Sequence, residues 1–181
     1  MRNASYRDAL RTVCESYRLF AIEGDDALRD RLGFAGADPG VLVAPDIAPY
    51  RERKVRLLNG GHTISVPLAL LAGCESVGEA VRHPLVGAFL RRAMLDEIAP
   101  TLGRPDAADY AHAVLARFAN PYVHHALFDI TLQGTMKMRV RVVPTIVRHT
   151  ERTGHAPDAL ALGFAAFLLF MRGDLHDARR A

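Results

Sequence analysis

A chain of 181 residues, half of them apolar, is long enough for one domain with a sizeable core or for one domain and part of another. Its net charge of +3 is the small difference between 23 basic and 20 acidic residues, so we expect no nucleic-acid partner. We expect no membrane span and no secretory signal, and the unpaired pattern of Cys14 and Cys74 favours a cytoplasmic location.

The first part of the chain predicts short elements of both types. They are a helix over 6–15, a strand over 17–23, a helix over 25–32 and a strand over 41–44. Pro45 ends the last strand, and the composition changes after it. We therefore expect residues 1–45 to form a short α/β segment.

From Asp46 onward the pattern is mostly helical, so the fold class is mainly α. The predicted helices cover 64–72, 80–83, 85–99, 105–118, 122–132 and 159–171. The first of these starts at Thr63 or Ser65, Ser76 and Glu79 have capping-box spacing, and Asn120-Pro121 suits a helix start. Residues 137–150 are ambiguous, because their valines favour a strand and their flanks favour a helix.

Three polar residues before an apolar run have a spacing that suits acid–base chemistry. Lys54 can exchange a proton if its pKa is depressed, Asn59 can hold a developing oxyanion, and His62 can orient a hydroxyl. The alternative is structural: a solvated lysine, a capping asparagine and a histidine in the first helical turn. The spacing alone does not decide between the two.

The neighbours of these residues favour the functional interpretation. The like charges of Arg53 and Arg56 are expected to lower the pKa of Lys54. Gly60-Gly61 would allow a ligand to approach the backbone closely. A predicted helix N-terminus near Asn59 would favour negative charge there.

Other polar residues are weaker candidates. Lys137 is the second of only two lysines, and it is either a functional ammonium or an exposed lysine near a turn. His124 and His125 would point in different directions on a helix, so we expect no metal site. No Gly-x-Gly-x-x-Gly pattern follows a strand, so the chain has no dinucleotide fingerprint of its own.

Several separated motifs together resemble the polyol-specific long-chain dehydrogenases of the mannitol dehydrogenase family. They lie at 19–24, 46–54, 54–62, 76–80, 117–122, 134–144 and 162–173. The resemblance implies an NAD-dependent oxidoreductase with an N-terminal Rossmann domain that holds the cofactor. It also implies a helical C-terminal domain of the 6-phosphogluconate dehydrogenase C-terminal-like type, which brings most of the acid–base residues.

The resemblance assigns a role to each matching residue. It implies that Lys54 is the general acid–base, Asn59 polarises the reacting oxygen, His62 positions the substrate and Lys137 contacts it. Asp129 stands where the mannitol enzymes carry an arginine, which speaks against mannitol and for a keto sugar acid and its polyol acid. Arg56 and Arg139 are then candidates for contacts with the acid's carboxylate.

The resemblance also divides the chain. Residues 1–45 would be the remnant or junction of the Rossmann domain, and 46–181 the helical C-terminal domain, ending early. The rest of the cofactor domain, with one further oxyanion-pocket asparagine, is expected elsewhere, so the chain would be a fragment, a split gene product or a truncated homologue. Expected partners are a sugar-acid or polyol substrate and either a separate Rossmann-domain chain or a second copy.

Two alternatives stay open at this point. The chain could be a non-catalytic helical interaction module derived from the enzyme. It could also be a family dehydrogenase that acts on a different sugar acid or on a neutral polyol.

Overall fold

The computed structural model describes Leu10 and residues 17–173, which form two compact units that meet between Tyr50 and Arg51. The helix predicted over 6–15 lies outside the described residues, apart from Leu10.

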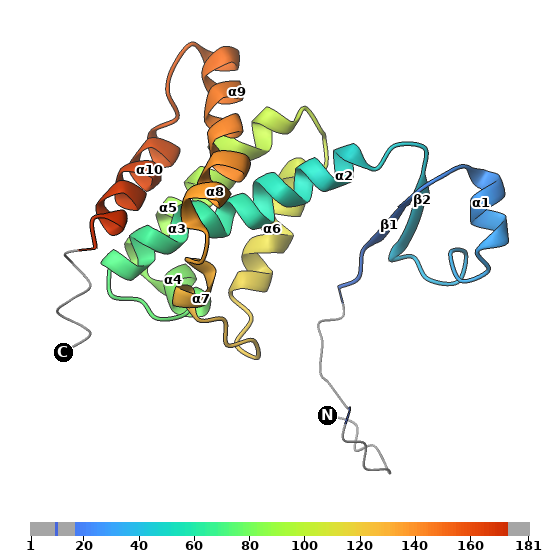
Figure 1. Ribbon diagram of the computed structural model, residues 1–181, viewed down its shortest axis with the longest axis horizontal. Helices are drawn as coiled ribbons and strands as arrows, with labels where there is room; N and C mark the ends of the chain where they lie inside the picture. Colours follow the sequence, from blue (N-terminus) through green and yellow to red (C-terminus); the bar gives the residue numbers. More distant parts are fainter. Residues whose placement is uncertain (1–9, 11–16, 174–181) are drawn as a thin grey trace. The chain divides into compact units, whose positions relative to one another are not determined.

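The first unit has a strand–helix–strand order (Figure 1). Strand β1 (Phe20–Glu23) pairs in parallel with β2 (Val41–Ala44), and α1 (Asp26–Arg31) lies between them in sequence. The α1 helix begins where it does because the Asp25 carboxylate accepts the Leu28 N–H at 2.8 Å. Both strands and this helix were predicted from the sequence, with the first strand shorter than expected.

Apart from one isolated β-bridge, the regular elements described in the second unit are helices, and the first of them, α2, begins just before the boundary between the units (Figure 1). Its α-helices are α2 (Ala48–Arg53), α3 (Gly60–Leu71), α4 (Val77–Arg82), α5 (Pro84–Arg92), α6 (Ala107–Phe118), α7 (Leu127–Ile130), α8 (Gly134–Lys137), α9 (Val143–Thr153) and α10 (Asp158–Met171). Three π-helical turns, η1 (Lys54–Asn59), η2 (Ala93–Ile98) and η4 (Met138–Val142), and one 3₁₀ turn, η3 (Ala99–Leu102), extend them. The mainly α fold with a short α/β segment is therefore confirmed.

The first helix of this unit starts much earlier than the sequence predicts. An unbroken helical run extends from Ala48 through α2, η1 and α3 to Leu71, so the start predicted at Thr63 or Ser65 is wrong. Both hydroxyls bond backward along the helix. Thr63 Oγ1 donates to the Asn59 carbonyl and Ser65 Oγ to the Gly61 carbonyl, each at 2.7 Å, so neither acts as a cap.

The capping box at the start of α4 is confirmed. The Ser76 hydroxyl accepts the Glu79 N–H, and the Glu79 carboxylate accepts the Ser76 N–H in return. His83 then ends α4 and begins α5, with Pro84 in the first turn of α5. A helix runs on through η2 and η3, as the apolar stripe over 85–99 predicts.

The helix predicted over 122–132 is wrong for most of its length. Asn120 Oδ1 accepts the Tyr122 N–H at 3.0 Å, which forms a turn instead of a helix cap. The chain then runs extended beside the segment before α4, where the His125 carbonyl accepts the Val77 N–H. Only the four residues of α7 are helical, whereas the ambiguous segment 137–150 is helical in η4 and α9.

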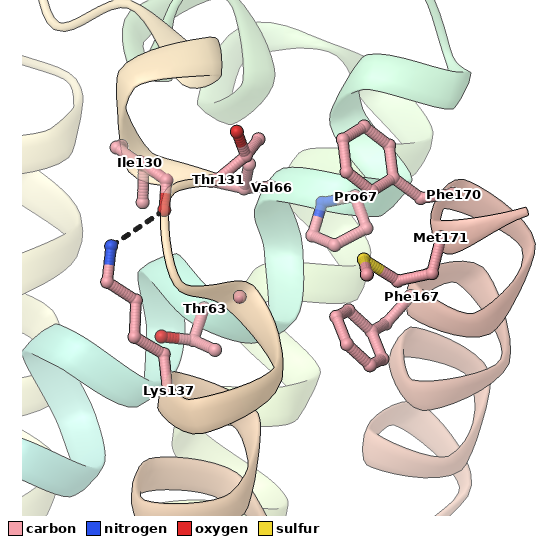
Figure 2. A pocket seen from close by; sticks show the side chains of 10 residues that line it. Thr63, Val66, Pro67, Ile130, Thr131, Lys137, Phe167, Phe170 and Met171 are labelled. Carbon is pink, nitrogen blue, oxygen red and sulfur yellow. Dashed lines mark hydrogen bonds between the residues drawn. The ribbon is translucent and has the colours of Figure 1, made fainter. Parts of the chain in front are cut away.

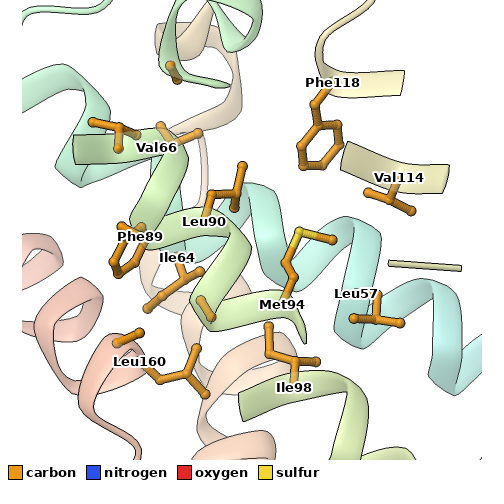
Figure 3. Packing of buried hydrophobic residues seen from close by; sticks show 14 of the residues in the cluster. Leu57, Ile64, Val66, Phe89, Leu90, Met94, Ile98, Val114, Phe118 and Leu160 are labelled. Carbon is orange, nitrogen blue, oxygen red and sulfur yellow. The ribbon is translucent and has the colours of Figure 1, made fainter. Parts of the chain in front are cut away.

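The core of the helical unit surrounds α3, which contacts most of the other helices (Figure 3). Ile64 of α3 is fully buried together with Leu90 of α5, Met94 of η2 and Leu160 of α10. Gly163 lets α10 approach α3 closely, since a Cβ at this position would lie 2.5 Å from Ile64 Cγ1. None of the described helices has the length and apolarity that a membrane crossing requires.

Candidate active site

Lys54, Asn59 and His62 all lie on the helical run that passes through η1 into α3. In an α-helix, five positions would separate Lys54 and Asn59 by about 140° around the axis. The π-helical turn changes this, because the Gly60 N–H bonds to the Val55 carbonyl and five residues then make about one turn. Lys54 and Asn59 therefore lie on the same side of the helix, and His62, three positions after Asn59, is about 60° from Asn59 around the axis.

Two members of this trio have free polar groups. Lys54 is exposed, and its ammonium has no hydrogen bond or ion pair with the described residues. Asn59 is half-buried, and its amide caps no helix. The predicted helix N-terminus at Asn59 is wrong, because the backbone is helical on both sides of it. Any polarisation of a substrate oxygen would come from the amide itself.

The two arginines beside Lys54 are engaged elsewhere. Arg53 forms an ion pair with Asp106 and lies 4.4 Å from the centre of the Tyr110 ring. Arg56 forms an ion pair with Glu52 at 3.1 Å. Partners thus compensate both of the charges that were expected to act on Lys54.

The imidazole of His62 is held between two rings. Its centroid lies 3.9 Å from that of Phe118 and 5.3 Å from that of His125, which meets it edge-on. Burial lowers the pKa of His62 from 6.5 to about 3, and the positive charges of His125, Arg141 and Arg117 act in the same direction. The ring is therefore neutral near pH 7 and can both donate and accept a hydrogen bond.

Lys137 lies at the end of α8, on the other side of Thr63 from the aromatic residues of α10 (Figure 2). Its Nζ donates to the Ile130 carbonyl at 3.0 Å. Burial lowers the pKa of its amine, and the charge of Arg141 lowers it further. Lys137 is thus partly buried and held by the backbone, which differs from the exposed lysine of the structural alternative.

Arg141 is a residue of this region that the sequence analysis missed. It lies in η4 four positions after Lys137, and its Nη1 donates to Thr63 Oγ1 at 3.3 Å. Its positive charge lowers the pKa values of both His62 and Lys137, so it lies near both side chains. The four-residue spacing from Lys137 is the sequence signal that could have found it.

Arg56 does not suit the role of a substrate contact. Its side chain is buried and donates to both Glu52 oxygens and to the carbonyls of Val140, at 2.6 Å, and Arg141, at 3.1 Å. It therefore joins η1 to η4 and has little left to offer a ligand. Arg139 is exposed, and its side chain has no hydrogen bond or ion pair with the described residues.

The paired glycines serve packing between helices. A Cβ on Gly61 would lie 3.1 Å from Met94 Sδ, and one on Gly60 would lie 3.5 Å from the Arg141 carbonyl. The close approach predicted for a ligand is thus made by protein. The nearby pocket beside Lys137, lined by Thr63, Pro67 and Phe167, measures about 20 Å³, which holds about one water molecule and no sugar (Figure 2).

The histidines of the described residues do not gather into a metal site. His124 and His125 are exposed in the segment before α7, and in the part of the chain that the structure describes no three potential ligands gather. This leaves a set of proton-exchanging and hydrogen-bonding groups: one free amine, one amide, one neutral imidazole and two further cations. Such a set suits chemistry at a hydroxyl or carbonyl.

Comparison with known proteins identifies the family of this chain. Residues 46–181 match the mannitol dehydrogenase C-terminal domain family, and the chain belongs to it. The resemblance drawn from the motifs is thereby confirmed.

Two relatives that are similar to most of this chain are altronate oxidoreductases. The chain is 40% identical over 171 residues to an altronate oxidoreductase of Pectobacterium carotovorum subsp. carotovorum (strain PC1), covering 93% of this chain and 35% of the relative. It is 43% identical over 165 residues to an altronate oxidoreductase of Bacillus subtilis (strain 168), covering 91% and 34%. The chain thus spans about a third of the length of these relatives.

A solved structure shows the same fold. A Pseudomonas fluorescens mannitol 2-dehydrogenase, in a ternary complex with NAD and D-mannitol, superposes with a TM-score of 0.66 and 32% identity. The superposition covers 74% of this chain and 28% of the other.

Proposed function

We propose that this chain carries the acid–base residues for NAD-dependent interconversion of a keto sugar acid and its polyol acid, namely tagaturonate and altronate. The observation that carries the proposal is the π-helical turn, which brings Lys54 and Asn59 to one side of the helix with the neutral His62 next to them. The relatives named altronate oxidoreductase support the choice of substrate.

Each residue has a defined share of the chemistry. In the reducing direction, the Lys54 ammonium donates a proton to the oxygen that becomes an alcohol. The Asn59 amide donates a hydrogen bond to the same oxygen as its negative charge grows, and His62 orients a neighbouring hydroxyl. In the oxidising direction, the neutral Lys54 amine removes the hydroxyl proton, while Lys137 holds a more distant part of the substrate.

The hydride in such a reaction comes from the nicotinamide ring of NADH. The first unit of this chain does not fit the cofactor's pyrophosphate. Its α1 helix has six residues, and the Asp25 carboxylate already occupies the helix N-terminus, where a pyrophosphate would need free N–H groups. We therefore place the cofactor on polypeptide other than the described residues, on a Rossmann domain.

The first unit is nevertheless suited to be the last piece of such a domain, ending near residue 45. Its two strands are parallel, and parallel sheets are normally covered on both faces. Here Phe20 of β1 is 59% exposed, and Val43 is the one buried apolar residue among those described in the unit. These exposed apolar groups favour a larger sheet around the two strands.

The test is reductase activity of the full chain mixed with a separately produced N-terminal domain of an altronate oxidoreductase. NADH oxidation should depend on tagaturonate, and Lys54→Ala should lower turnover by about 10² or more. Arg51→Ala, which removes an exposed cation three residues earlier, is the matched control and should retain turnover. Near-normal turnover of Lys54→Ala would rule out the acid–base role.

A second candidate, a non-catalytic helical interaction module, is favoured by one observation. An apolar groove runs between α3 and α10, lined by Leu68, Leu71, Leu162 and Leu169 among others. Isothermal titration of the full chain with NADH and tagaturonate addresses this candidate. A stable homo-oligomer that binds neither compound would support the module, and rescued reductase activity would refute it.

The third possibility concerns the substrate alone. A family dehydrogenase acting on fructuronate or mannitol would use the same Lys54, Asn59 and His62. Turnover of a panel containing tagaturonate, fructuronate and fructose distinguishes these reactions, and we expect tagaturonate to be preferred.

A further inference from the structure

A sugar acid brings a carboxylate into the site, and a buried or half-buried carboxylate needs a cation with free donors. Most cations near the site already use their N–H donors in contacts within the protein. Arg53 pairs with Asp106, and Arg56 is saturated by Glu52 and two carbonyls. Lys137 has given one donor to the Ile130 carbonyl.

Arg141 differs from these cations in its surroundings. It is half-buried, and among the described residues its guanidinium has a single hydrogen-bond partner, Thr63, and no ion pair. A guanidinium has five N–H donors arranged as a planar fork, so most of the fork is left over. Its charge also reaches both His62 and Lys137, two residues of the proposed site.

The position of this side chain is fixed from two sides. The Thr63 hydroxyl gives its proton to the Asn59 carbonyl, so its oxygen lone pairs face the Arg141 guanidinium. The Arg141 backbone is held by Arg56, whose guanidinium donates to the Arg141 carbonyl. Thr63 therefore links the Asn59 backbone carbonyl to the Arg141 guanidinium, and it holds the guanidinium beside the helical turn that carries Asn59.

We infer that Arg141 recognises the carboxylate of the sugar acid and thereby selects acids over neutral polyols. This inference rests on the proposed function for the site, and it replaces Arg56 and Arg139 as carboxylate contacts. A planar guanidinium matches a carboxylate with two parallel N–H···O bonds, a geometry that an ammonium such as Lys137 cannot offer.

The test measures binding to the full chain by ¹H–¹⁵N NMR titration near pH 7.5 and at low salt. The probes are D-altronate and the neutral polyol D-altritol. Arg141→Gln should weaken altronate binding by at least about tenfold and leave altritol binding unchanged. The altronate affinity of Arg141→Lys should lie between those of the wild type and Arg141→Gln, because lysine keeps the positive charge but lacks the planar fork of donors. Arg139→Gln, an exposed arginine of the same helical turn, should change neither.

Several results would overturn the inference. These are altronate affinity within about twofold of wild type in Arg141→Gln, an equal loss in Arg139→Gln, or no altronate binding by the wild-type chain. A sugar phosphate such as sorbitol 6-phosphate serves as a further probe, and its tighter binding through Arg141 would overturn the carboxylate assignment. Since the readout is binding, a chain that binds altronate through Arg141 but never supports turnover would refute only the proposed function.

Discussion

At the scale of single residues, His62 shows how packing sets the chemistry of a side chain. Its ring lies against Phe118, and the nearby charges of His125, Arg141 and Arg117 are all positive. Both burial and these charges disfavour the imidazolium, so the pKa falls to about 3. A histidine held neutral in this way can donate a hydrogen bond to a substrate hydroxyl or accept one from it. It does not compete with Lys54 for the proton of the reacting oxygen.

The lowered pKa of His62 predicts a pH dependence of stability. Between its ordinary pKa of 6.5 and the folded value of about 3, the unfolded chain binds a proton that the folded chain refuses. Stability therefore falls as the pH drops through this range. Between pH 7 and pH 4.5, the wild type should lose roughly 2 kcal/mol more free energy of unfolding than His62→Gln, after allowing for partial solvation of the ring.

Urea denaturation at the two pH values measures this difference. His112→Gln removes an exposed histidine from α6 and is the matched control, which should keep the wild-type dependence on pH. An equally steep loss of stability in His62→Gln would show that other groups cause it.

The sequence could indicate which residue types carry the chemistry, but not which cations are available. Lys54, Asn59 and His62 were found from their spacing, and the structure places them on one helical run. Arg56 was a candidate ligand contact because arginines are usually exposed. In the structure it is buried and donates to carbonyls 84 and 85 residues away. Arg141 was missed for the converse reason, since its half-buried position depends on Thr63, 78 residues earlier.

At the scale of elements, local signals predicted helix starts well only where no tertiary contact competed. The Ser76 capping box formed as predicted, whereas Thr63 and Ser65 resemble caps in sequence but lie in mid-helix. The π-helical turns are a second limit. Two of them, η1 and η4, are joined by the hydrogen bond from Arg56 to the Val140 carbonyl. No residue pattern in the sequence predicts where such a turn forms.

The contact between α3 and α10 yields a prediction about packing. Gly163→Ala should gain up to about 1 kcal/mol of helix propensity, yet its Cβ would lie 2.5 Å from Ile64 Cγ1 and 2.9 Å from Phe89 Cζ. Both neighbours are buried, so an overpacking cost of about 1–3 kcal/mol should outweigh the gain and lower the free energy of unfolding. Urea denaturation measures this change in the free energy of unfolding.

The matched control for this substitution is Gly78→Ala in α4. There the new Cβ would meet the far end of the flexible Arg82 side chain at 3.3 Å, so the variant should be as stable as the wild type or slightly more so. If Gly163→Ala proved as stable as Gly78→Ala, the close approach of α10 to α3 would be wrong.

At the scale of the whole molecule, the two units differ in how completely they bury their apolar residues. The main hydrophobic cluster lies entirely within the helical unit, from Leu57 to Phe167. In the first unit, the residues described before α2 form two four-residue strands and one short helix, and this helix has no buried residue. A core of that size cannot offset the conformational entropy of its own chain.

This difference predicts that the helical part folds without the first unit. A fragment covering 46–181 should keep its helical circular dichroism and unfold cooperatively, with a midpoint within about 4 °C of the full chain, since little buried area is removed. A fragment covering 1–45 should show no cooperative transition, because a two-stranded parallel sheet is not stable alone. Thermal scans of both fragments beside the full chain measure this. If 46–181 lost its helices, the first unit would contribute to the helical core, and the division near residue 50 would be wrong.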